Sequence, residues 1–278
     1  MILKSNPEAL NIFRRILYRS TFYAVSAYFI FFILERLIML AGAAMYGYSA
    51  NITYKAIKIK ADFVEWNQES VLIIYLLPYI IQAIILVLLY ANLQRRMSKP
   101  GYLRIFTLWM MFFIVFRLLG MLPVHLYYKT GIYHAFNWLY VGLALKILIG
   151  FTGIVLFFLS SVRILNGVFF FFGTFNNNNK EIGLKNLSYS SLLVPALASC
   201  IIPLLFFLPG LPKEEMIGLI LLMLPLIYVL LRLIITDAGF LPSRIWVEEN
   251  NNPLRFFLVV LLVIIILRII LGIGFSFN

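Results

Sequence analysis

The chain has 278 residues, of which 63% are hydrophobic and only 12% charged, and its formal net charge is +12. Soluble domains carry about 45–50% apolar and about 25% charged residues, so this composition excludes an ordinary soluble domain. The apolar residues fall in blocks of about 20, the length that a helix needs to cross a bilayer. The sequence therefore predicts an all-α, polytopic transmembrane helical bundle, the class that satisfies every backbone hydrogen bond inside lipid.

Seven apolar blocks qualify as membrane spans, and residues 1–278 are expected to form a single integral membrane domain. Residues 1–20 form a basic leader ahead of the first span. Glu214 and Glu215 fall in the first turn of the sixth span, where carboxylates offset the positive end of the helix dipole. Pro253 suits the first turn of the last span. The expected spans are 21–46, 71–93, 105–127, 138–161, 191–209, 216–236 and 254–276.

Lysine and arginine residues outside these spans are distributed unequally between the two sides of the membrane. The side that holds the leader carries 13 of them, and the opposite side carries 5. By the positive-inside rule, the N-terminus is predicted to be cytoplasmic and the C-terminus to be outside. The expected location is the cell inner (plasma) membrane, which the chain crosses several times.

Two segments outside the spans are less clear. Residues 164–175 are strongly apolar but too short for another span, so they either prolong the fourth helix or lie in the membrane interface. The segment from Ile57 to Phe63 alternates apolar and polar residues, which is a weak strand signal. It predicts a small extracytoplasmic ribbon.

Charged residues inside the spans are the main candidates for a functional site, because an intramembrane charge is costly and usually faces the interior of the bundle. If each helix is centred on its apolar block, five charged side chains lie within about one helical turn of the midplane. Gln82 is expected at the centre of the second span and can join them. The five are Glu35, Arg36, Arg117, Lys146 and Arg268.

Glu35 and Arg36 are neighbours on one helix, so their side chains diverge by about 100° and do not easily pair. The natural partners of Glu35 are Arg117, Lys146 or Arg268. One acid against four bases would leave the midplane with a surplus of about three positive charges, which calls for an anion or water.

We therefore expect a non-enzymatic membrane carrier or lipid-handling protein. An anionic lipid or a small anionic ligand would contact Arg117, Lys146 and Arg268. Glu35 would neutralise these bases or gate the site through an ion pair. Arg36 and Gln82 would complete the site. The alternative is a structural or accessory subunit whose buried bases meet acids on partner membrane subunits. A lipid-modifying enzyme with Glu35 as acid or base is the third hypothesis.

Other chemistry has no support in the sequence. There is no His-Glu-x-x-His zinc motif, nucleotide-binding loop or nucleophile elbow. The only histidines, His125 and His134, are expected near the third loop as interfacial or loop side chains. No metal or cofactor is expected. The bilayer itself is the expected partner, and nucleic acid is not, because the positive charge lies at helix ends.

Overall fold

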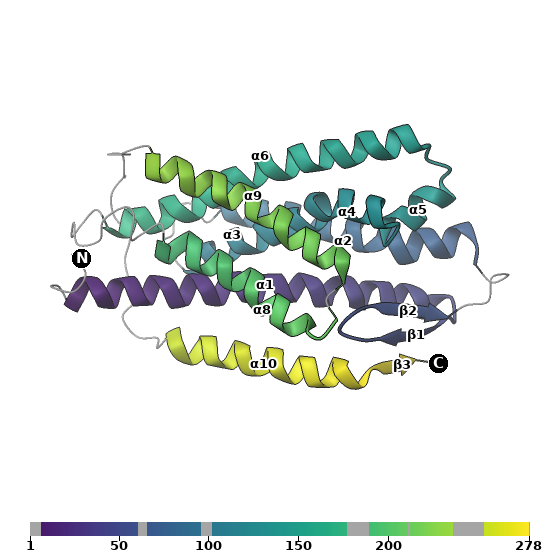
Figure 1. Ribbon diagram of the computed structural model, residues 1–278, viewed down its shortest axis with the longest axis horizontal. Coiled ribbons are helices and arrows are strands. Elements are labelled where there is room, and N and C mark those ends of the chain that lie inside the picture. The colour runs from purple at the N-terminus through teal and green to yellow at the C-terminus, as the bar shows by residue number, and fades with distance from the viewer. Residues whose placement is uncertain are drawn as a thin grey trace.

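The computed structural model describes residues 7–60, 66–95, 102–176, 189–210, 212–235 and 253–277. In this part of the chain, seven long helical segments run along one axis, and a small antiparallel sheet lies at one end (Figure 1). The prediction of an all-α, multi-pass helical bundle is confirmed. The helices are α1 (Pro7–Met45), α2 (Gln68–Arg95), α3 (Tyr102–Val115), α4 (Met121–Tyr128), α5 (Ile132–Trp138), α6 (Leu143–Asn176), α8 (Val194–Phe207), α9 (Lys213–Ile235) and α10 (Pro253–Ile273).

Two short π-helical turns complete these segments. The turn η2 (Phe116–Gly120) joins α3 to α4, and η3 (Tyr189–Leu193) leads into α8. Six of the seven segments contain an apolar stretch of at least 18 residues, long enough to cross a membrane. The seventh, α10, has 21 residues, which is also close to the length that a bilayer requires.

Most of the predicted spans match these helices, but their ends differ. The described part of the basic leader, from Pro7 onward, is helical and continuous with the first span. The apolar residues 164–175 prolong the fourth span, so that α6 reaches Asn176. The last predicted span also included the first two residues of a short strand, and its helix ends at Ile273.

The predicted ribbon is present and has three strands. Strand β2 (Ile57–Lys60) pairs antiparallel with β1 (Ser49–Ile52), which also pairs with β3 (Phe275–Phe277). The sheet thereby joins the connection after α1 to the segment that follows α10. The start of α1 lies at one end of the bundle and β3 at the other (Figure 1), as an odd number of spans requires.

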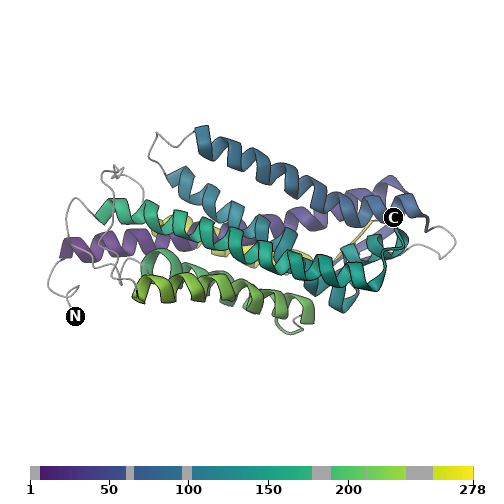
Figure 2. The ribbon, with the colours of Figure 1, turned by 90° about the horizontal axis from the view of Figure 1, so that it is seen from above.

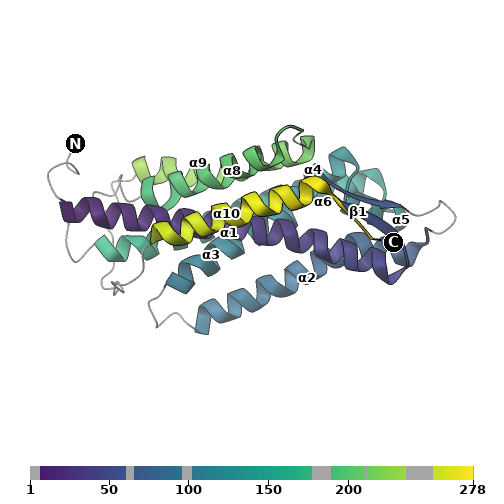
Figure 3. The same ribbon diagram turned by 90° about the horizontal axis from the view of Figure 1, so that it is seen from below.

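Helix α1 is the centre of the bundle. Helices α8 and α9 lie on one side of it, and α2 and α3 lie on the other (Figures 2 and 3). Buried aromatic side chains fill the space between α1, α3 and α8, with the rings of Phe29 and Phe206 meeting edge to face at 5.1 Å. Trp109 donates a hydrogen bond to the Ser20 hydroxyl at 3.0 Å, and this hydroxyl donates to the Ser191 carbonyl at 2.8 Å. This polar chain ties three segments together within an apolar core.

The hairpin of α8 and α9 stops short of the C-terminal end of α1 and the N-terminal end of α6 (Figure 1). The turn between strands β1 and β2 lies against the tip of this hairpin, because a Cβ added at Gly210 would overlap the Lys55 side chain. The hairpin therefore carries the first turn of α9 into the bundle, next to α1 and the η2 turn.

Candidate functional site

A buried network of charged side chains lies where α1, the η2 turn and α9 meet. Arg117 Nη1 lies 3.0 Å from Glu215 Oε1 and 3.7 Å from Glu35 Oε2. The Arg117 side chain is 3% exposed, that of Glu215 is 9% exposed, and that of Glu35 is 18% exposed. Glu35 thus pairs with Arg117, one of the three partners expected from the sequence.

Local structure explains how α9 comes so close to Arg117. A π turn inserts one extra residue into a helix, often at functional sites, and η2 carries Arg117 in such a turn. On α9, Gly218 lies one turn beyond Glu215, on the same face. A Cβ at Gly218 would overlap the Met121 sulfur at the start of α4, so glycine permits this approach without a shift of the Met121 side chain.

Aromatic and polar groups surround the three charges. The Tyr28 hydroxyl donates to Glu215 Oε2 at 3.3 Å. The centre of the Arg117 guanidinium lies 5.3 Å from the Tyr28 ring centroid and 5.5 Å from that of Phe32, within range of a cation–π interaction. Two of its donors, Nε and Nη2, are buried and have no hydrogen-bond partner among the residues that the structure describes.

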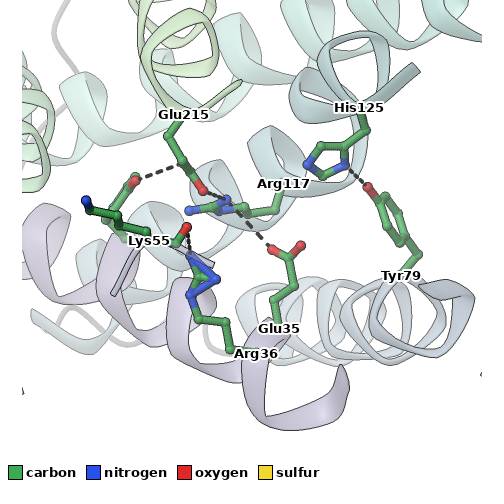
Figure 4. Close-up of polar contacts among 8 residues, drawn as sticks. Glu35, Arg36, Lys55, Tyr79, Arg117, His125 and Glu215 are labelled. Carbon is green, nitrogen blue, oxygen red and sulfur yellow. Dashed lines mark hydrogen bonds and ion pairs between the residues drawn. The ribbon is translucent and has the colours of Figure 1, made fainter. Parts of the chain in front are cut away.

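Arg36 lies beside this network but does not pair with its neighbour Glu35. Its guanidinium lies 3.9 Å from the centroid of the Phe32 ring, and Nη2 donates to the Lys55 carbonyl at 3.5 Å (Figure 4). With Glu35, Arg117 and Glu215, it makes a set of two acids and two bases. The expected surplus of about three positive charges is therefore wrong, because Glu215 adds a second acid and because Lys146 and Arg268 have their contacts elsewhere.

A second polar pair faces Glu35 from the other side (Figure 4). Tyr79 of α2 and His125 of α4 form a hydrogen bond of 2.6 Å between the hydroxyl and Nδ1. His125 is buried against the bundle in the last turn of α4, at the end of its span and next to the third loop. No pattern in the sequence indicated its contact with Tyr79.

The remaining predicted site residues lie elsewhere. Lys146 was expected near the midplane, but α6 runs from Leu143 to Asn176, so this lysine lies in its first turn. Arg268 donates to the Leu208 carbonyl at 2.6 Å and lies 3.5 Å from the Tyr54 ring centroid. Gln82 is buried in α2, with no polar contact to the charged network among the described residues. The six residues do not form one site.

Lys146 instead belongs to a groove formed by α4, α5 and α6, with a volume of about 530 Å³. Its ammonium group donates to Asn137 Oδ1 and lies 4.6 Å from the Tyr133 ring centroid. Lys129 also lines the groove, and no carboxylate does. The other lining residues are Pro123, Leu126, Tyr127, Tyr133, Leu143, Ile147, Gly150, Phe151 and Ile154.

A second cavity, of about 380 Å³, lies between α1, α3 and α10. Its lining is apolar or aromatic except for the hydroxyl groups of Tyr23 and Ser26, and it holds no charge. Glu35 lines neither cavity. Within the described residues, no three His, Cys, Asp or Glu side chains lie close enough to hold a metal ion.

Comparisons with known proteins identify no relative. No family model matches the chain, and neither the curated proteins nor the solved structures yield a match. Any functional conclusion therefore depends on the geometry of the network and of the groove.

Proposed function

We propose that this protein is a lipid-handling membrane protein that binds the anionic headgroup of a phospholipid in the groove of α4, α5 and α6. The observation that carries the proposal is the pair of cations, Lys129 and Lys146, on an otherwise apolar and aromatic lining without a carboxylate. Cations of this kind bind phosphate groups through charge-assisted hydrogen bonds. Acyl chains fit the exposed apolar surface of α6 that continues from the groove through Ile147 and Phe151.

The position of the groove supports the same ligand. Tyr127, Trp138 and Tyr140 are exposed around it, and aromatic residues of this kind gather where a membrane meets water. Headgroups lie at that level. With the N-terminus in the cytoplasm, the groove would face the outer leaflet of the plasma membrane.

Native mass spectrometry of protein in nanodiscs tests this function. Nanodiscs that contain equal amounts of phosphatidylglycerol and phosphatidylcholine should yield protein that preferentially retains the anionic lipid. The double variant Lys129→Gln, Lys146→Gln should lose the preference, whereas Lys58→Gln, on the exposed face of β2, should keep it.

Equal retention of both lipids by the wild-type protein would overturn the proposal, as would an unchanged preference in the double variant. A stoichiometric protein partner that is lost in the double variant would favour the accessory subunit instead.

A further inference from the structure

The two carboxylates of the charged network are held unequally. Glu215 accepts hydrogen bonds from Arg117 at 3.0 Å and from Tyr28 at 3.3 Å. Glu35 lies 3.7 Å from the same Arg117 nitrogen and accepts no hydrogen bond from the described residues. A carboxylate that accepts no hydrogen bond is less well stabilised in its ionised form than one that accepts two.

The charges of the three central residues of the network also do not cancel. Glu35, Arg117 and Glu215 together carry one negative charge when both acids are ionised. Arg36 balances this charge only from a distance, because its own contacts are the Phe32 ring and the Lys55 carbonyl. One added proton would make the central three residues neutral and would leave the shorter Arg117–Glu215 pair intact.

Glu35 is also the more accessible of the two acids, with 18% of its side chain exposed against 9% for Glu215. The Tyr79–His125 pair lies on its other side, and this pair contains groups that can relay a proton. The titratable and charged groups around Glu35 are Tyr28 and Arg36 of α1, Tyr79 of α2, Arg117 of η2, His125 of α4 and Glu215 of α9 (Figure 4).

We propose that Glu35 is a proton-binding site inside the bundle, at which Arg117 holds the carboxylate form and releases the protonated form. A proton delivered from water forms an O–H bond on the carboxyl group and replaces the ion pair at 3.7 Å. Arg117 keeps Glu215 as its partner in both states. Intramembrane acids of this kind serve as proton relays in pumps and transporters.

This site is separate from the lipid groove, which Glu35 does not line. It gives the protein a second ligand, the proton, whether or not a lipid is bound. Uptake of a proton by Glu35 would loosen the contact between α1 and the segment that continues from η2 into α4. Because α4 also lines the groove, the two sites share this helix.

Infrared difference spectroscopy of the reconstituted protein tests the proposal. As the pH is lowered, a protonated carboxyl without hydrogen bonds should give a C=O band at higher frequency than surface carboxyl groups give. This band should be absent from Glu35→Gln and present in Glu69→Gln, which alters an exposed acid at the start of α2. In Glu35→Asp the band should remain but shift, because the shorter side chain changes its surroundings.

Two results would overturn the proposal. One is a high-frequency band of unchanged size in Glu35→Gln, or no such band in the wild-type protein at any pH at which it stays folded. The other is unfolding of Glu35→Gln at every pH, because glutamine resembles the protonated carboxyl and should be tolerated by a site that binds a proton reversibly.

Discussion

Glu215 Oε1 lies 3.0 Å from Arg117 Nη1, although 98 residues separate the two in the chain. This ion pair joins the first turn of α9 to the π turn between α3 and α4. Both side chains are buried, so neither charge has water to stabilise it if the other is removed.

Replacement of Arg117 should therefore be strongly destabilising. We expect Arg117→Gln to lower the free energy of unfolding by about 3–5 kcal/mol, as is typical when one partner of a buried ion pair is lost. Thermal denaturation in detergent would measure the effect. The double variant Arg117→Gln, Glu215→Gln should recover part of the loss, and Arg163→Gln, at an exposed position on α6, should change little. A single variant as stable as Arg163→Gln would show that the pair contributes little.

A methyl group at Gly218 should require a shift of its neighbours. In Gly218→Ala the new Cβ would overlap the Met121 sulfur, so α9 must move or Met121 must repack. Overpacking of this kind costs about 1–3 kcal/mol. The comparison is Gly142→Ala, where a Cβ would meet no atom within 4 Å. The shorter side chain in Met121→Val should reduce the penalty, and a loss at Gly218 no larger than at Gly142 would contradict the expectation.

His134 should make stability depend on pH. It lies on α5, outside the membrane-spanning segments, and partial burial lowers the pKa of its imidazole. The folded protein therefore favours the neutral ring. As the pH falls below about 6.5, the unfolded chain takes up the proton first, so the free energy of unfolding decreases until the lowered pKa is passed. The denaturation temperature of the wild-type protein should fall over this interval more than that of His134→Phe, which retains a ring against Tyr75. Parallel curves for the two proteins would refute this role.

Binding of an anionic lipid in the groove should weaken at high salt, and it should also weaken in the single variant of Lys146. A hydrogen bond to a charged group contributes about 1.5–3 kcal/mol, so Lys146→Gln should weaken retention of phosphatidylglycerol at least about tenfold. Raising the salt concentration from about 0.1 M to 1 M shortens the screening length from about 10 Å to 3 Å and should also weaken it. Retention of phosphatidylcholine should respond less to both changes, because its choline ammonium offsets the charge of its phosphate. Lipid competition in nanodiscs would measure both effects, and equal losses for the two lipids would argue against charge recognition.

The apolar blocks were sufficient to predict the helices of the bundle, because a membrane demands long uninterrupted runs. They were less informative about helix ends. The fourth span was centred too early, since the apolar residues up to Phe172 belong to the same helix, and this error placed Lys146 too deep. The alternation after Ile57 indicated β2, whereas β1 was not predicted, and Phe275 and Ser276 of β3 were assigned to the last span because they follow its apolar run directly.

The charged network was predictable only in part. Glu35 and Arg117 stood out because charge is rare inside an apolar run. Glu215 did not, because an acid in the first turn of a helix has an ordinary explanation in the helix dipole. Its contact with Arg117 depends on how far the α8–α9 hairpin reaches into the bundle and on the absence of a side chain at Gly218, and neither is encoded in a local pattern.

The π turn at Phe116–Gly120 makes one place in this span tolerant of a change in chain length. A π turn holds one residue more than an α turn, so the loss of a single residue there would restore a regular α turn. The residues that follow would keep their orientation, with His125 still facing Tyr79. Elsewhere in the span, the same deletion would turn everything that follows by about 100°, because each residue of an α-helix advances by that angle. A deletion of one codon would thus act as a local repair at η2 and as a rotation of half the span elsewhere.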